Sequence, residues 1–256
     1  MKLLINKILK NNFYLNLRNL FNIKPIHMSL DGLAGSSVSD AFAWRTDNGF
    51  VTKFKYSDIL NIFYKINNSW VEFHFYSKNN QLLKVKKVTS LDLSNEININ
   101  PNFLDGLEDY GSFYIYHYSR DNNIGKDIIS NRCYLGYSHN NNLFSFVHGN
   151  TLASYSKISQ SGNVSTNIVK TSFFRNHEYK LQKYFNNFDK SELFFSNPTS
   201  KLIKFSIDNE KYKLKTGCSI IIDISQKKII NIKSNCLFFR PTIFSYKNQY
   251  LDVHHG

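Results

Sequence analysis

Two histidines in alternating apolar stretches are the residues best placed for acid–base chemistry. His117 ends the run Phe113–His117 (FYIYH), and His148 ends the run Phe144–His148 (FSFVH). In a β-strand, residues two apart share a face, so each imidazole would point toward an aromatic interior. A neutral imidazole there could act as a general base or metal ligand. The alternative is a core histidine that is hydrogen-bonded to a backbone carbonyl.

An acidic cluster offers a second kind of chemistry. Asp105, Glu108 and Asp109 lie in the segment PNFLDGLEDYG, just before a tyrosine-rich stretch. Glycoside hydrolysis needs two carboxyl groups that flank the scissile bond at a fixed separation. These acids, with His117 and His148, are therefore the candidate catalytic residues of a carbohydrate-active enzyme. A solvated loop is the alternative for the acids.

Aromatic residues favour binding rather than catalysis. Tyr114, Tyr116 and Tyr118 alternate along one stretch, so they would line one face of a strand. Flat rings on such a face can stack on saccharide rings or unpaired bases, with Asn amides nearby for hydrogen bonds. Packing between sheets or subunits is the alternative. The candidate ligand-binding residues are Tyr114, Tyr116, Tyr118, Arg120, Arg132, Tyr137, Trp44 and Arg45.

The sequence lacks the motifs of familiar cofactor and metal sites. It contains no G-x-G-x-x-G, G-x-x-x-x-G-K, H-E-x-x-H, G-x-S-x-G or C-x-x-C. Cys133, Cys218 and Cys236 are therefore expected to be buried thiols, and neither a metal nor a cofactor is expected. These absences favour a non-catalytic binding protein over an enzyme.

The 256 residues include 32 Lys and Arg against 19 Asp and Glu, a net charge of +13. Lys, Asn, Ile, Phe and Tyr, all abundant here, have AT-rich codons, and six of the cations are Arg, the residue that binds phosphates and bases bidentately. The charge thus predicts weak, non-specific adhesion to polyanions. A third hypothesis is a polyanion- or nucleic-acid-binding structural protein. Its cationic sheet face would be Lys204, Lys211, Lys213 and Lys215, whose alternative role is to prevent unwanted strand pairing.

The elements that must position these residues are mostly strands. Apolar and polar residues alternate in Trp70–Tyr76 and Ser112–Tyr118, and candidate strands recur from Ser37 onward. Such stretches, separated by short polar turns, are typical of antiparallel strands with one solvent-facing side. The predicted fold class is therefore mainly β, an antiparallel sandwich or curled barrel-like sheet. Short helices are expected at Asp58–Lys65 and Glu178–Phe188.

We expect a basic N-terminal extension and linker over residues 1–36, helical or irregular, followed by an antiparallel β domain over residues 37–256. A division into two subdomains would fall near residues 155–170. No apolar stretch of sufficient length precedes a small-residue cleavage site, so a cytoplasmic location is expected. Residues 1–25 carry five cations and no carboxylate, and could contact a membrane surface or a partner.

Three segments carry a resemblance to known proteins: Ser37–Arg45 (SVSDAFAWR), Arg132–Tyr137 (RCYLGY) and Phe144–Asn150 (FSFVHGN). They resemble parts of poorly characterised β-rich proteins that are encoded beside bacterial surface-polysaccharide genes. The resemblance implies a cell-envelope or glycan context and assigns no catalytic residue. With the tyrosine-rich stretch, it makes a saccharide or surface polysaccharide the leading expected ligand.

Overall fold

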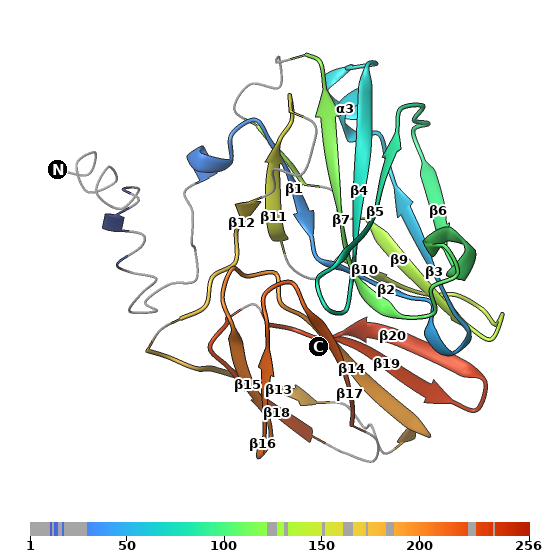
Figure 1. The fold of residues 1–256 in the computed structure, drawn as a ribbon, viewed down its shortest axis with the longest axis vertical. Coiled ribbons are helices and arrows are strands. Elements are labelled where there is room, and N and C mark those ends of the chain that lie inside the picture. The colour runs from blue at the N-terminus through green and yellow to red at the C-terminus, as the bar shows by residue number, and fades with distance from the viewer. Residues whose placement is uncertain are drawn as a thin grey trace.

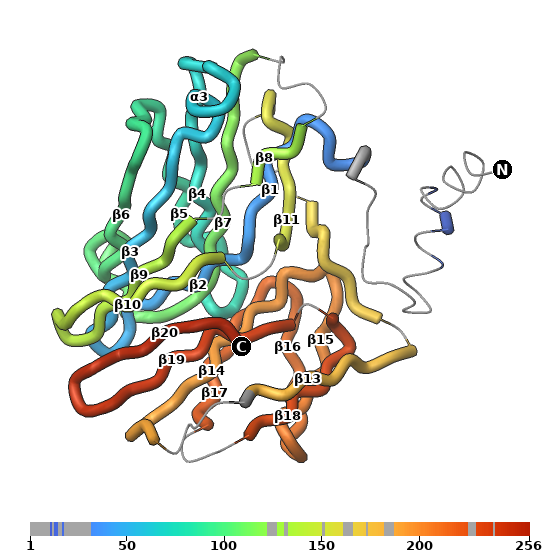
Figure 2. The backbone as a smooth tube through the Cα atoms, turned by 180° about the vertical axis from the view of Figure 1, so that it is seen from behind, coloured from blue at the N-terminus to red at the C-terminus, as the bar shows by residue number. Residues whose placement is uncertain are grey.

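Alternating apolar and polar residues form strands along the chain, which we describe from a computed structural model (Figures 1 and 2). The prediction of a mainly β, sandwich-like fold is confirmed. No helix in the described residues is long and apolar enough to cross a membrane. The predicted N-terminal extension lies largely outside those residues. Described are residues 11, 13, 14, 17 and 30–256, apart from 122–126, 131–132, 150–151, 161–165, 173, 183–186, 225–228 and 238.

The tyrosine-rich stretch forms the longest strand of an antiparallel sheet. Its apolar residues face inward, where the rings of Phe113 and Phe75 stack with centroids 5.1 Å apart. Burial of such aromatic surface is the main source of stability in a sheet of this kind. The strand order is β2 (Phe42–Arg45), β7 (Tyr110–Ser119), β4 (Ser69–Ser77) and β5 (Leu82–Val88).

A second antiparallel sheet packs against this inner face. Phe54 reaches from it toward the first sheet, and its ring centroid lies 5.0 Å from that of Phe113 and 5.8 Å from that of Phe73. The two sheets share one aromatic core. The strand order is β10 (Ser145–His148), β9 (Tyr134–His139), β3 (Phe50–Tyr56) and β6 (Asn95–Ile99).

A third sheet lies along the edge of β7 and against the hydroxyl ends of its tyrosines. Its serines meet β7 directly: Ser39 Oγ accepts a hydrogen bond from the Ile115 N–H at 2.9 Å, and Ser37 Oγ accepts one from the His117 N–H at 2.8 Å. The pairing of β1 with β8 is parallel, whereas β11 pairs antiparallel with β1 and β12. The strand order is β12 (Thr166–Asn167), β11 (Leu152–Lys157), β1 (Ser36–Asp40) and β8 (Ile128–Ser130).

Two further antiparallel sheets build the C-terminal part of the molecule, the lower half of Figure 1. One has the order β13 (His177–Gln182), β18 (Ile229–Ser234), β15 (Ile203–Ile207) and β16 (Glu210–Leu214). The other has the order β17 (Ser219–Asp223), β14 (Lys190–Ser196), β19 (Thr242–Lys247) and β20 (Tyr250–His255).

The sheet around β14 and β19, here called the shared sheet, serves two hydrophobic cores. Phe194 and Phe244 point into the aromatic core of the first two sheets. Their sequence neighbours Phe195 and Ile243 point into a second core, built with β13, β15 and β18. Alternation along each strand therefore buries both of its faces. The subdomain boundary expected near residues 155–170 stays a prediction.

Helical structure among the described residues is limited to short segments. Local capping explains α3 (Ile59–Tyr64), because the Asp58 carboxylate accepts a hydrogen bond from the Asn61 N–H at 3.2 Å, which confirms the helix expected there. The helix expected at Glu178–Phe188 is wrong over residues 178–182. These residues belong to β13, where pairing with β18 outweighs local helix propensity. The 3₁₀ turns are η1 (Leu30–Leu33), η2 (Asp47–Gly49) and η3 (Pro101–Leu104).

A buried ion pair joins β2 to the shared sheet. The Arg45 side chain is 1% exposed and donates from Nη1 to Glu192 Oε2 at 2.7 Å and from Nη2 to Asp47 Oδ2 at 2.7 Å. Its guanidinium carbon lies 3.9 Å from the centroid of the Phe50 ring and 4.9 Å from that of Phe244. Arg45 is therefore held by charge, hydrogen bonds and aromatic contacts at once.

The partners of Glu192 keep it ionised despite its burial. Desolvation alone would raise its pKa, but the charge of Arg45 and hydrogen bonds from Lys190, Arg45 and Tyr246 lower the pKa to about 2. Tyr246 donates its hydroxyl proton to Glu192 Oε2 at 2.8 Å, and Lys190 Nζ lies 2.6 Å from Oε1. The carboxylate thus has donors on both oxygens.

Arg45→Met would leave Glu192 and Asp47 without their buried partner. We expect the free energy of unfolding to fall by about 3–5 kcal/mol, measured by urea unfolding. Lys247→Met, which removes an exposed pair with Asp189, is the matched control and should have a much smaller effect. Equal losses in the two variants would contradict the role given to Arg45.

Acidification should weaken the same network. Because the folded-state pKa of Glu192 is lowered, its stabilisation is complete above the ordinary value of 4.5 and is lost as the pH falls toward about 2. The difference in unfolding free energy between the wild type and Glu192→Gln should therefore shrink across this window. Denaturant titrations at several pH values measure it, and a difference independent of pH would count against the ionised pair.

Candidate functional site

The predicted tyrosine face does not reach solvent as one surface. Tyr116 and Tyr118 are buried, and Tyr114 is half-buried. The hydroxyl of Tyr116 shares a hydrogen bond with Ser154 Oγ, and that of Tyr118 lies 2.9 Å from Ser156 Oγ. The covering strand β11 thus fills the space that a stacked ligand would need. The expectation of an open stacking face on β7 is wrong because a third sheet covers it.

Three other predicted ligand-binding residues are also buried. Trp44 donates its indole proton to the Tyr76 carbonyl at 2.9 Å, and Tyr137 donates its hydroxyl proton to the Ala43 carbonyl at 3.0 Å. Arg45 lies in the ion-pair network described above. These residues hold strands together, so the structure gives them no open surface.

Of the two arginines predicted to bind a ligand near the tyrosine strand, only one lies within the described residues. Arg120 is exposed, immediately after the end of β7. Arg132 lies outside the described residues. The pair therefore adds no defined site to the covered face.

The candidate catalytic histidines belong to different sheets. His117 is fully buried in β7, and burial lowers its pKa to about 4. His148 is exposed on β10, where its ring centroid lies 4.8 Å from that of His255. One imidazole is inside the first sheet and the other on an outer surface, so they do not line a common cleft.

The candidate acids line a turn rather than a cleft. Asp109 Oδ1 lies 2.9 Å from Lys78 Nζ, and the exposed Asp105 lies 3.5 Å from Lys84 Nζ. Glu108 is exposed between them in sequence. Opposite charges on the surface account for this arrangement, and it agrees with the solvated-loop alternative.

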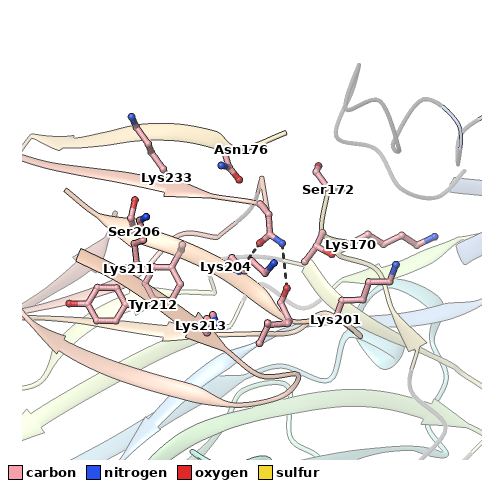
Figure 3. Close-up of a pocket in the computed structure, with 14 residues that line it drawn as sticks. Lys170, Ser172, Asn176, Lys201, Lys204, Ser206, Lys211, Tyr212, Lys213 and Lys233 are labelled. Atoms are coloured by element: carbon pink, nitrogen blue, oxygen red, sulfur yellow. Dashed lines mark hydrogen bonds between the residues drawn. The ribbon is translucent and has the colours of Figure 1, made fainter. Parts of the chain in front are cut away.

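The described surface does contain a groove of about 1100 Å³ on the C-terminal part, lined by basic and neutral residues (Figure 3). We call it the lysine groove. None of its described lining residues is acidic. Its six lysines are Lys170, Lys201, Lys204, Lys211, Lys213 and Lys233.

Strand pairing explains why lysines gather in this groove. In the hairpin of β15 and β16, Lys204 is directly opposite Lys213, and Ser206 is directly opposite Lys211. On the other side of β15, Ser206 is also opposite Lys233 of β18. Cross-strand partners share a face, so four positive charges project from one patch of the sheet.

Most of this charge is not neutralised within the described part of the chain. Lys233 Nζ lies 3.5 Å from Glu178 Oε2, whereas no described carboxylate pairs with Lys204, Lys211 or Lys213. Like charges directly opposite one another on neighbouring strands destabilise a sheet. An anion between Lys204 and Lys213 would relieve that repulsion.

Sequence alternation predicted three of the six lysines that line this groove. Lys204, Lys211 and Lys213 were expected on one sheet face, and the hairpin places them there, whereas Lys215 lies beyond the end of β16 and does not line the groove. Of the other three lysines, Lys201 lies three residues before Lys204 in the sequence, whereas Lys170 and Lys233 come from distant segments. The proximity of these two depends on pairing between β15 and β18 and on the approach of residue 170, for which we found no sequence signal.

The cysteines and acids of the described residues provide no metal site. Cys133 and Cys236 are buried and Cys218 is half-buried. No group of three His, Cys, Asp or Glu side chains in the described residues could hold a metal ion.

Comparisons with known proteins do not assign a family. No family model matches the chain, and no curated protein matches it significantly. The crystal structure of Streptomyces avermitilis alpha-L-rhamnosidase complexed with L-rhamnose is 6% identical, with a TM-score of 0.25 over 91% of this chain and 28% of that chain. An anti-sigma factor domain-containing protein is 10% identical, with a TM-score of 0.20 over 85% and 80%. Such low TM-scores do not establish a common fold.

Protonation of His117 should destabilise the protein. Because burial lowers its folded-state pKa to about 4, the unfolded chain takes up this proton first as the pH falls below the ordinary value of 6.5. The stabilisation is complete above pH 6.5 and is lost as the pH falls toward 4. We expect an NMR titration midpoint near 4 for this imidazole, and a midpoint near 6.5 would contradict its burial.

Proposed function

We propose that this protein is a non-catalytic binding protein that holds an anionic polymer in the lysine groove. The observation that carries the proposal is the cross-strand pair Lys204 and Lys213, two like charges without a described counter-ion in a groove that has no described acidic lining. A fold gains no stability from such a pair by itself. A row of phosphate, sulfate or carboxylate groups would supply the missing negative charge.

The arrangement of the charges suits a polymer better than a small anion. Lys170 and Lys201 extend the positive surface beyond the strands that carry Lys204, Lys211 and Lys213, as Figure 3 shows. An open groove lined by several lysines can contact several charged groups of one chain in succession. Contacts of this kind displace counter-ions from the polymer, so binding is strong at low salt and weakens as salt rises.

Lysine rather than arginine sets the expected specificity. An ammonium group is a strongly hydrated point charge, whereas a guanidinium fork recognises the geometry of a phosphate or a base. The described lining contains lysine but no arginine. We therefore expect the groove to recognise charge and spacing, with little dependence on polymer sequence. An acidic surface polysaccharide fits this chemistry, and the sequence resemblance implies a cell-envelope or glycan context.

The triple variant Lys204→Gln/Lys211→Gln/Lys213→Gln tests the groove. Its affinity for heparin and for polyphosphate at low salt should fall by roughly tenfold to a hundredfold, because three contacts are lost. The slope of log K against log salt should become shallower by about 2, since each neutralised charge contributes about 0.7–0.9. Fluorescence anisotropy with labelled polymers measures both quantities.

A matched control has the same change in net charge at another surface. Lys84→Gln/Lys86→Gln/Lys87→Gln removes three lysines from β5, outside the groove. We expect its affinity to stay within about twofold of the wild type. If both triple variants lose affinity equally, binding follows total charge and the groove is not the site. If the wild type binds neither polymer at low salt, the proposed function is wrong.

A further inference from the structure

A second surface lies on the outer face of the sheet β10–β9–β3–β6, seen at the left of Figure 2. Strand pairing arranges its side chains in two rows across the four strands. One row is Phe146, Gly136, Lys53 and Asn98, and the other is His148, Tyr134, Lys55 and Glu96. Aromatic side chains thus occupy one half of this face and charged or amide groups the other half.

Two rings on this face are open to solvent. Phe146 is 43% exposed and Tyr134 is 58% exposed, although both belong to regular strands. Phe144, just before β10, lies beside Phe146 with ring centroids 6.0 Å apart. Aromatic rings exposed together on a sheet differ from the tyrosines of β7, because no sheet among the described residues packs over them in this way.

A glycine fixes the position of the central ring. A Cβ atom added at Gly136 would lie 2.5 Å from Cε1 of Phe146, and the nearest atoms it would meet all belong to that ring. The Phe146 ring therefore lies directly over the Gly136 backbone. The backbone of Gly136 has no positive φ, so its missing side chain serves the close approach of the ring.

Ammonium groups lie over the faces of the rings, so a base that stacks there would displace them toward its own phosphates. Lys53 Nζ lies 5.1 Å from the centroid of Phe144, and Lys55 Nζ lies 5.3 Å from that of Phe146. Lys53 also pairs with Glu96 at 3.1 Å, whereas Lys55 is exposed. A ligand that covers the rings would therefore bring its own substituents next to ammonium groups.

We propose that this aromatic face binds the unpaired bases of a single-stranded nucleic acid. Bases stack on flat rings whatever their identity, and the phosphates between them lie within reach of lysines beside the rings. An uncharged saccharide could cover the same rings but would gain little from the two ammonium groups. The aromatic face is on a different sheet from the lysine groove, so this proposal does not depend on the function proposed above.

The test separates base stacking from charge by means of two matched ligands. Labelled oligothymidine and an abasic oligonucleotide of the same length carry the same phosphates, and anisotropy measures their affinities for the full chain. We expect the wild type to bind oligothymidine about tenfold more tightly than the abasic strand. Phe146→Ala should abolish most of this difference and leave the abasic affinity within about twofold.

Two more variants distinguish the position of the ring from its mere presence. Gly136→Ala keeps Phe146 but displaces its ring, so it should also reduce the preference for oligothymidine. Phe63→Ala removes a ring that is 71% exposed on α3, and it should leave the preference unchanged. Circular dichroism of each variant establishes that the strands are retained.

Several results would overturn the proposal. Equal affinity of the wild type for the two strands, equal losses in Phe146→Ala and Phe63→Ala, or equal losses for both ligands would each exclude base stacking on Phe146. Binding of a neutral oligosaccharide such as maltoheptaose that depends on Phe146, without any preference for oligothymidine, would identify a saccharide face instead. Failure of heparin to bind the lysine groove bears on the other proposal alone.

Discussion

The buried pair between Arg45 and Glu192 is the interaction on which the arrangement of the molecule depends. It joins β2 of the first sheet to β14 of the shared sheet, across a region where both sides are otherwise aromatic. Burying two charges away from water costs free energy unless hydrogen bonds satisfy them. Here Asp47 pairs with Arg45, and Lys190 and Tyr246 bond to Glu192. The apolar cores supply most of the stabilisation, and the pair adds a directional contact between the two halves.

Cations in this protein fall into two groups with different physical roles. Arg45 is enclosed and fully partnered, so its charge serves the fold. Four lysines of the groove project from one sheet face and three of them have no described counter-ion, so their charge is available to a ligand. The aromatic residues divide in the same way: the tyrosines of β7 are covered, whereas Phe146 and Tyr134 remain open. Both proposed binding sites therefore lie on surfaces that the cores do not use.

Local sequence patterns predicted individual strands correctly but did not predict which faces of those strands are covered. Alternation identified β4 and β7, and the capping of α3 by Asp58 is likewise local. The same alternation suggested a solvent-facing tyrosine side, but β11 covers it, and no local pattern shows how many layers a fold has. The lysine hairpin was predictable because β15 and β16 are adjacent in sequence. The aromatic face was missed because alternation shows which residues share a face but not whether that face is covered, even though Phe146 meets Gly136 across the consecutive strands β9 and β10.

The double burial of β14 raises the question of how this strand keeps its alignment. Its run Leu193–Phe195 is apolar on both sides, so sliding the strand by one residue would still offer an apolar side chain to each core. Hydrophobicity alone therefore leaves two alignments nearly equivalent. Glu192 distinguishes the two alignments. Only the observed alignment brings its carboxylate to Arg45, whereas the other would place that charge on the side of the second apolar core. A single polar contact thus favours one alignment of the strand, whereas apolar packing alone accommodates more than one.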